Sequence, residues 1–341
     1  MISITLGLFL ISGAIGVLVS SKSSYNLNSS LTLIQDNARF ATSTLNRDVR
    51  MAGFFGCSTA QGFNSTLNPA PSGSGWYMDF DNAVSGWDGD DPGYPDSEFP
   101  DAYNSQAASG MPTSDILTIR RSDGTDVEVA DNDPPSSATI DIVGTHPYED
   151  GDILVITDCE QTTVFQVTGG NSNKIVHNTG TGSPGNCTKF LGGVPCSSAA
   201  ANKKIFRGDD GAFIVQIKSH AYYVTEGGDG APALFRRELV ADSGNPDLID
   251  EEFVQGVENI QVFYGYDSDG DGFANRYVDA DEIAAIDWPN VVTVRTHFLI
   301  RSFSQVASEP QDFRFVGETF TPDDRFLRQE FISTVELRNK G

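Results

Sequence analysis

The chain has 341 residues, of which 39% are hydrophobic, and this composition excludes a mainly disordered protein. Its formal net charge of -25 comes from 47 acidic and 22 basic residues, so its surface should repel nucleic-acid phosphates and anionic membrane surfaces. Membrane attachment would therefore need a hydrophobic segment. The excess Asp lies mostly in Gly-, Pro- and Ser-rich stretches, which favours either solubility in a salty medium or, at individual clusters, binding of divalent cations.

The first 21 residues carry no charged side chain and contain the apolar run ISITLGLFLISGAIGVLVS. About 20 such residues span a bilayer core as a helix. Residues 1–24 are therefore predicted to form a transmembrane segment, or to pack with other helices of the same kind. A secretory signal peptide would start with basic residues, but the first one here, Lys22, follows the apolar run.

Beyond this run the helical pattern continues over residues 25–56. Apolar side chains recur every three or four residues, which is one face of an α-helix: Leu27, Leu31, Ile34, Ala38, Ala41, Leu45, Val49 and Ala52. Polar residues, among them Asp36, Asp48 and Arg50, are assigned to the other faces, and Gly53 or Gly56 can end the helix. The sequence thus predicts one N-terminal helix, residues 1–56, of about 50 residues and roughly 75 Å, with its second half lying against a globular domain.

Residues 57–341 are predicted to form that globular domain. Its first part, 58–113, is rich in turn-forming residues and aromatics, which form either a small local core or a surface for a glycan or partner: Trp76, Tyr77, Phe80, Trp87, Tyr94, Phe99 and Tyr103. Strands are predicted, from β-branched and aromatic runs between turn clusters, at 115–121, 138–143, 152–157, 162–168, 173–177, 212–225, 233–239, 257–266, 291–301 and 331–338, with a short helix at 279–286. Strands and helices do not alternate, so the predicted fold is α+β: a long helix packed on a predominantly antiparallel sheet with long loops.

Four cysteines, Cys57, Cys159, Cys187 and Cys196, form no CxxC motif, and an even number favours two disulfides in an exported protein. Of the three pairings, the first choice joins Cys187 to Cys196 across a small loop and Cys57 to Cys159 as a long tie. The alternative is four reduced, buried thiols.

Catalytic motifs are missing from the sequence. The histidines at 146, 177, 220 and 297 are isolated and lack metal-ligand spacing, so each is assigned a structural or surface role. No G-x-S-x-G, HExxH, phosphate-binding or dinucleotide-binding motif occurs. We therefore predict that the chain is not an enzyme.

One motif does indicate chemistry. Residues 267–279 read DSDGDGFANRYVD, which starts like a calcium loop: Asp267, Asp269 and Asp271 supply carboxylates, and Gly272 allows the tight turn. The carbonyl of Phe273 and the side chain of Asn275 are the next ligands. Position twelve is Val278 and not an acid, so Asp279, or Asp281, is predicted to close the site. The alternative is an acidic hairpin turn without metal.

The sequence also resembles the PilW-type minor type IV pilins. The resemblance lies in TLGLFLISGAIGVLVSSKSSY, LIQDNARFATSTLNRDVRMAGFFGC, SDILTIRR, ITDCEQTTVFQVT, HAYYVTEGGDGAPALFRREL, VQGVENIQVFYGYDSDGDGFANRYV and FISTVELRN, which follow the family order from end to end. Pilins also carry a basic leader and a mature start with Phe first and Glu fifth. Because Met1 would align several residues into that mature helix, leader cleavage and glutamate-guided docking are assigned to no residue here.

The resemblance implies a structural subunit for pilus assembly and initiation at the filament tip or surface, within a fimbrium that serves cell adhesion. Its implied partners are other minor and major pilins, contacted through the N-terminal helix, and a large tip adhesin. The implied location is the bacterial inner membrane with the globular domain in the periplasm, and later the extracellular pilus. The alternatives are a minor pseudopilin of type II secretion, a calcium-stabilised, membrane-anchored adhesin or glycan-binding module, and, third, a hydrolase.

Overall fold

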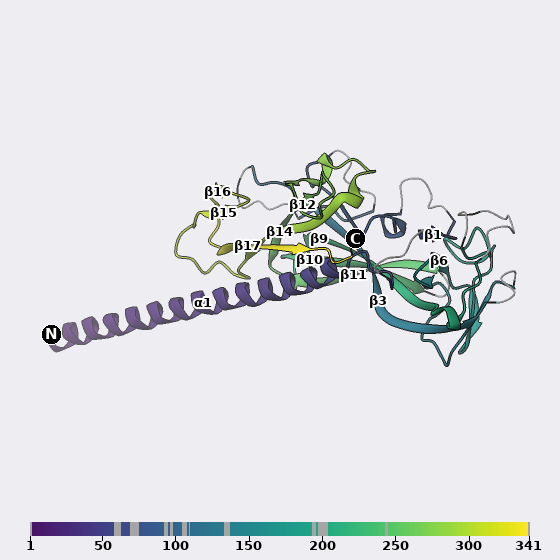
Figure 1. The fold of residues 1–341 in the computed structure, drawn as a ribbon. Coiled ribbons are helices and arrows are strands. Elements are labelled where there is room, and N and C mark those ends of the chain that lie inside the picture. The colour runs from purple at the N-terminus through teal and green to yellow at the C-terminus, as the bar shows by residue number, and fades with distance from the viewer. Residues whose placement is uncertain are drawn as a thin grey trace.

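The structure is a computed structural model that describes residues 2–57, 63–68, 75–91, 95, 98–103, 108, 110–132, 137–192, 196, 204–242 and 245–339. In these residues one long α-helix, α1 (Ile2–Met51), projects from a body of β-strands (Figure 1). The amino-terminal part of α1 extends well beyond that body, and its carboxyl-terminal part lies against it. The predicted α+β class, with one N-terminal helix and a large, mostly antiparallel β-domain, is confirmed.

The described strands form three sheets. The largest has eleven strands, in which only the pair β1–β6 is parallel; they are β1 (Phe63–Ser65), β2 (Val84–Trp87), β3 (Ile116–Asp131), β4 (Thr139–Ile142), β5 (Ile153–Thr157), β6 (Thr162–Gln166), β7 (Gly169–Asn171), β8 (Lys174–Val176), β9 (Phe213–Glu226), β10 (Pro232–Asp242) and β11 (Asn245–Gln255). A four-stranded antiparallel sheet has the order β13 (Arg276–Val278), β12 (Val257–Tyr266), β14 (Val291–Arg301), β17 (Arg328–Glu336). The hairpin β15 (Phe313–Phe315) and β16 (Glu318–Phe320) stands apart.

The carboxyl-terminal half of α1 packs on both larger sheets. Its apolar stripe is almost fully buried, at 2% exposure or less, in the largest hydrophobic core: Ile34, Ala38, Ala41, Leu45, Val49 and Ala52. That core also takes side chains from β3, β9, β12, β14 and β17, including Leu117, Tyr222 and Phe298. The predicted amphipathic face is therefore the face that holds the helix on the domain.

The amino-terminal half of α1 has its apolar side chains in the open. Six of them are more than half exposed: Leu10, Ile11, Ile15, Val17, Leu18 and Val19. Within the described residues, no helix reaches the combined length and hydropathy of a membrane span. The transmembrane part of the prediction for residues 1–24 is thus not supported.

The end of α1 is set by a glycine. After Met51 the chain reaches Gly53, whose φ of +74° favours a residue without a Cβ. The amide of Gly53 donates to the carbonyl of Arg120 on β3 at 2.9 Å, so the terminus is tied to the sheet. The first of the two glycines predicted to end the helix performs that role.

Four aromatics of the 76–103 region form a local core, whereas Phe80 belongs to a neighbouring cluster and Tyr103 packs against the largest core. Trp76 and Phe99 are buried with Tyr223 of β9, and Tyr77 and Trp87 pack against them. Of the seven aromatics named from the sequence, Tyr94 lies outside the described residues. Arg120 is fully buried and holds this region by side-chain hydrogen bonds.

The guanidinium of Arg120 donates to the carbonyls of Trp76 and Asn82 and to the hydroxyl of Ser85, at 2.8–3.0 Å. Burial lowers the pKa of Arg120 to about 10. No pattern in the sequence indicates that this arginine is internal.

The structure has two disulfides, Cys57–Cys159 and Cys187–Cys196, which is the pairing preferred from the sequence. The first joins the segment after α1 to the turn that follows β5, across 102 residues. All four cysteines are paired, so the alternative of free thiols is wrong.

The helix prediction needs correction, and of the strands that were not predicted from the sequence β11 is the longest. The helix expected at 279–286 is a single 3-10 turn, Ala280–Glu282, because Ile283 takes an extended backbone and buries its side chain in the main core. The strand β11 was not predicted, since its acidic stretch DEE has low β-propensity; it forms because ten of its residues pair with β10.

We expect Leu45→Ala to destabilise the protein by about 3 kcal/mol, because it removes a fully buried side chain from the contact between α1 and the sheets. Leu33→Ala is the matched control on the same helix, where the side chain is 44% exposed, and it should cost less than about 1 kcal/mol. Urea denaturation measures both. Equal effects of the two substitutions would contradict the packing described above.

Candidate functional site

The predicted calcium loop joins β12 to β13. Tyr266, the last residue of β12, pairs with Arg276, the first residue of β13, so the loop is the tip of a hairpin. This agrees with the sequence, in which a strand, and not a helix, was expected before the loop. The turn is tight because Gly270 and Gly272 have φ of +77° and +86°.

Asp267 organises the loop. Its two carboxylate oxygens accept the amides of Asp269 (3.2 Å), Gly270 (2.7 Å) and Gly272 (2.8 Å). These amides, that of Gly272 above all, lower the pKa of Asp267 and keep it ionised. The loop therefore curls around one buried carboxylate.

Three predicted ligands converge in this loop. The carboxylates of Asp267, Asp269 and Asp271 each offer an oxygen, and these oxygens lie within 4.8 Å of one another. Asp267 is buried, whereas Asp269 and Asp271 are exposed. Such spacing suits a cation that prefers several oxygen ligands, although exposed carboxylates also gather without one.

The remaining predicted ligands have other surroundings. Asn275 lies in the loop, but its side-chain oxygen accepts the amide and hydroxyl of Ser268, at 2.7 and 3.0 Å. Phe273 follows Gly272, with its ring 72% exposed. Asp279 lies with Asp88 and Asp281 in a second acidic group. The structure thus brings together three of the six predicted ligands as carboxylates, and calcium binding stays a prediction.

Two members of the second acidic group, Asp279 and Asp88, have raised pKa values. Burial, followed by the nearby Asp88 and Asp281, raises the pKa of Asp279 to about 6. Burial also raises the pKa of Asp88. Asp115, on the buried side, has a pKa well above its usual range because burial outweighs the amides of Gly89 and Val262. This group was not recognised in the sequence, since its members come from segments almost 200 residues apart.

A cavity of about 570 Å³ separates the loop from the end of α1. The loop side is lined by Asp267, Gly270, Asp271 and Gly272, and the opposite side by Gly53, Phe55, Phe80 and Asp81. Asn290 and Asn339 complete the polar lining. The candidate loop therefore lies beside the point at which the helix meets the domain.

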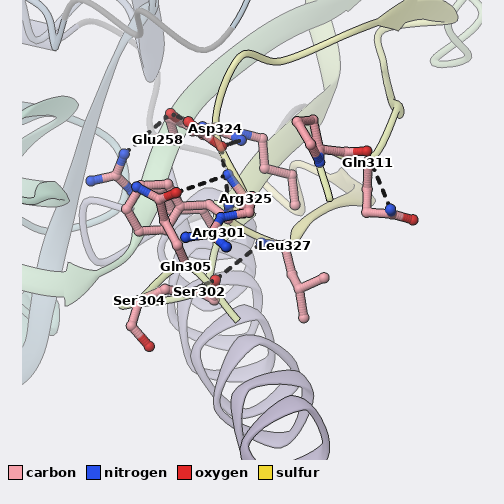
Figure 2. A network of polar contacts seen from close by, with 12 residues as sticks. Glu258, Arg301, Ser302, Ser304, Gln305, Gln311, Asp324, Arg325 and Leu327 are labelled. Atoms are coloured by element: carbon pink, nitrogen blue, oxygen red, sulfur yellow. Dashed lines mark hydrogen bonds and ion pairs between the residues drawn. The ribbon is translucent and has the colours of Figure 1, made fainter. Parts of the chain in front are cut away.

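Close to α1, a polar network holds the segment 302–327 on the four-stranded sheet (Figure 2). Arg328 contacts Glu258 and Asp324, each at 2.6 Å, and Arg301 lies 3.6 Å from Glu258. Ser302 exchanges hydrogen bonds with Leu327 at 2.9 and 3.0 Å. Figure 2 shows Ser302 and Ser304 close above a long helix, and Ser302 to Ser304 line a cavity of about 300 Å³ with Asn26, Ser30 and Leu33 of α1.

Sequence reasoning also missed the ionic contact between α1 and the sheets. Asp48, which was assigned to a polar face, is 2% exposed and contacts Arg121, His220 and Tyr222. Its position three residues after Leu45 and four before Ala52 places it at the border of the apolar stripe. This position on the helix was the one feature of the sequence that could have indicated the burial of Asp48.

Residues 221–339 match the family model PilW, Type IV Pilus-assembly protein W. The matched part runs from β9 to the end of β17 and contains the candidate calcium loop and the 302–327 segment. It overlaps three of the motifs quoted for the PilW resemblance, at 220–239, 254–278 and 331–339, and confirms that resemblance. The PilW match indicates a role in type IV pilus assembly. Neither curated proteins nor solved structures give a match to the chain.

We expect Asp279→Asn to stabilise the protein at pH 8, measured by urea denaturation in chelator. The native pKa of Asp279, about 6, is above its ordinary 3.8, so the ionised carboxylate is disfavoured in the native state. Stability falls as pH rises between these values and stays lower above them, and the amide removes this loss. Because Asp279 is only partly buried, solvent screens its charge, and the gain should be only about 1 kcal/mol.

At pH 4 the same substitution should give almost no gain, since the native carboxyl is protonated there. Asp312→Asn, at an exposed aspartate outside both acidic groups, is the control and should be neutral at both pH values. A gain at pH 4 equal to that at pH 8 would contradict the repulsion described for this group.

Proposed function

We propose that the chain is a minor type IV pilin-like subunit that takes part in pilus assembly and initiation at the filament tip or surface. One observation carries the proposal: α1 has a half that is buried in the β-domain from Ile34 onward and a half whose apolar side chains have no cover. A subunit of this shape gives its free half-helix to a bundle of similar helices and keeps its β-domain on the outside. The PilW match supports the class of assembly.

The partners proposed for the free half-helix are other minor and major pilins. Leu10, Ile15 and Leu18 are each more than half exposed, and a helix bundle would remove this apolar surface from water. With a net charge of -25, the β-domains of neighbouring subunits repel one another. The apolar half of the helix is then the surface through which subunits associate. A tip adhesin as a further partner, and residence in the inner membrane before assembly, stay predictions.

The helix proposal is tested by Leu18→Glu in cells that express the chain with their own pilins. Burying a carboxylate in a helix bundle is costly, so the amount of the chain in sheared pili should fall by about tenfold or more at unchanged total level. Ile286→Glu is the control, because Ile286 is 84% exposed in the β-domain and should tolerate the charge. Incorporation of Leu18→Glu at the level of the parent chain would refute the proposal.

We also propose that the loop 267–279 binds one calcium ion through Asp267, Asp269 and Asp271. The support is the convergence of three carboxylates around Gly272, together with a hairpin that this loop alone closes. The carbonyl of Phe273 and an oxygen of Asn275 or Asp279 are the further proposed ligands. The ion would offset the repulsion among the carboxylates and stabilise the hairpin between β12 and β13.

Calorimetric titration should give one site with a dissociation constant on the order of 10⁻⁴ M, because no acid occupies position twelve. A tenfold excess of calcium over that value should then stabilise the native state by about 1.4 kcal/mol. Asp267→Ala/Asp269→Ala should abolish both effects, and Asp312→Asn, at an exposed aspartate outside both acidic groups, should retain them. No heat of binding together with no shift in melting temperature would remove calcium from the proposal.

A further inference from the structure

Asp48 ties α1 to the domain by polar contacts from two strands. Its Oδ1 accepts Nε of Arg121, on β3, at 3.0 Å. Its Oδ2 accepts the hydroxyl of Tyr222 at 2.6 Å and lies 2.9 Å from Nδ1 of His220, both on β9. In the described part of the chain, every ion pair that joins α1 to a strand involves Asp48.

His220 lies between two carboxylates. Its Nδ1 faces Asp48, and its Nε2 lies 3.5 Å from Oε2 of Glu238, the residue opposite it on β10. An ionised carboxylate only accepts hydrogen bonds, so the ring satisfies both contacts only when both nitrogens carry a proton. The ring is 2% exposed, which leaves no room for water to replace a lost contact.

The charges around the ring come from each element packed against it. Asp48 belongs to α1; Arg121 on β3 also lies 4.0 Å from Asp123; Lys218 on β9 pairs with Glu238 at 2.7 Å. With the imidazolium, these contacts give every charge of this cluster an opposite partner. With a neutral ring, the unprotonated nitrogen of His220 would direct its lone pair at a carboxylate oxygen. Asp48 would still be paired with Arg121, and Glu238 with Lys218.

We propose that the Asp48–His220–Glu238 contact is a pH-sensitive latch, which holds the carboxyl-terminal half of α1 on the sheets while His220 is protonated and loosens when it is neutral. It places a switch at the junction between the helix and the β-domain. The latch does not require the pilus role to be correct.

The direction of the pH effect follows from the two partners. Burial lowers the pKa of His220, but the bonds to Asp48 and Glu238 outweigh it and raise the pKa above 6.5. Its contribution is complete below 6.5 and is lost as pH rises through the raised value. Burial raises the pKa of Asp48, but His220 and Arg121 outweigh the effect of burial, and the pKa is lowered. The stability that ionised Asp48 contributes is therefore lost only as pH falls below about 3.8. The latch is therefore closed at mildly acidic pH and opens on the alkaline side.

Hydrogen exchange of the full chain tests the latch at the α1 amides of residues 40–51, with exchange rates corrected for the intrinsic rates. Between pH 6 and pH 9 the protection of these amides should fall by about tenfold for each unit by which the contact raises the pKa of His220. His220→Gln should show the lower protection already at pH 6 and no further fall. His297→Gln is the matched control, because His297 faces one carboxylate, Glu330, at 2.7 Å on the β14–β17 pair.

Glu238→Gln keeps Asp48 and His220 in contact and serves if His220→Gln fails to fold. It removes one of the two carboxylates, so the fall in protection should move to lower pH. Two outcomes would overturn the latch: equal protection of the parent chain at pH 6 and pH 9, or a pH dependence that persists unchanged in His220→Gln. Loss of protection in His297→Gln equal to that in His220→Gln would show a general loss of stability and would overturn it as well.

Discussion

The burial of one stripe of α1 between two sheets is the constraint on which the remaining structure depends. Small residues at Ala38, Ala41 and Ala52 let the helix approach the strands closely, while Ile34, Leu45 and Val49 fill the space between them. Both larger sheets contribute to the same core, so the helix also fixes one sheet relative to the other. Without it, the apolar faces of β12 and β14 would be open to water on one side. The projecting half of α1 is the consequence, since it has no sheet to cover it (Figure 1).

Features that depend on local pattern could be predicted from the sequence. The period of three and four identified the buried face of α1, and the β-branched and aromatic run at 291–301 predicted β14, whose Val292, Val294 and Phe298 are all buried. The tight turn at Gly272 also followed from residue type, whereas the disulfide pairing was a first choice among three that the sequence left open. The strand β11 did not, because its ladder depends on β10 and not on its own composition.

Polar groups that depend on tertiary contacts were the least predictable part of the candidate sites. Asp48 reads as a surface residue until Arg121, His220 and Tyr222 are brought to it from strands 73 or more residues away. Asp279 was predicted to close the calcium loop from its position along the chain, and the structure also places it with Asp88 and Asp281, directly after Val278 of β13 pairs with Tyr264 of β12. A charge of -25 offers many carboxylates for such assignments. Only the backbone path decides which of them meet.

The candidate loop and the end of α1 are joined by a short path of backbone hydrogen bonds. The amide of Asp267 donates to Asn290, and that of Leu337 donates to Val292, two residues further along. The amide of Arg338 then donates to Arg50 in the last turn of α1, at 3.4 Å. Order in the loop therefore favours order in the 290–292 segment, in the chain after β17 and in the helix end. Asp48 holds the same part of α1 on the largest sheet, through His220 and Arg121. Both larger sheets therefore contact the carboxyl-terminal end of α1, and a structural change in either sheet at this point would alter how the projecting helix is held.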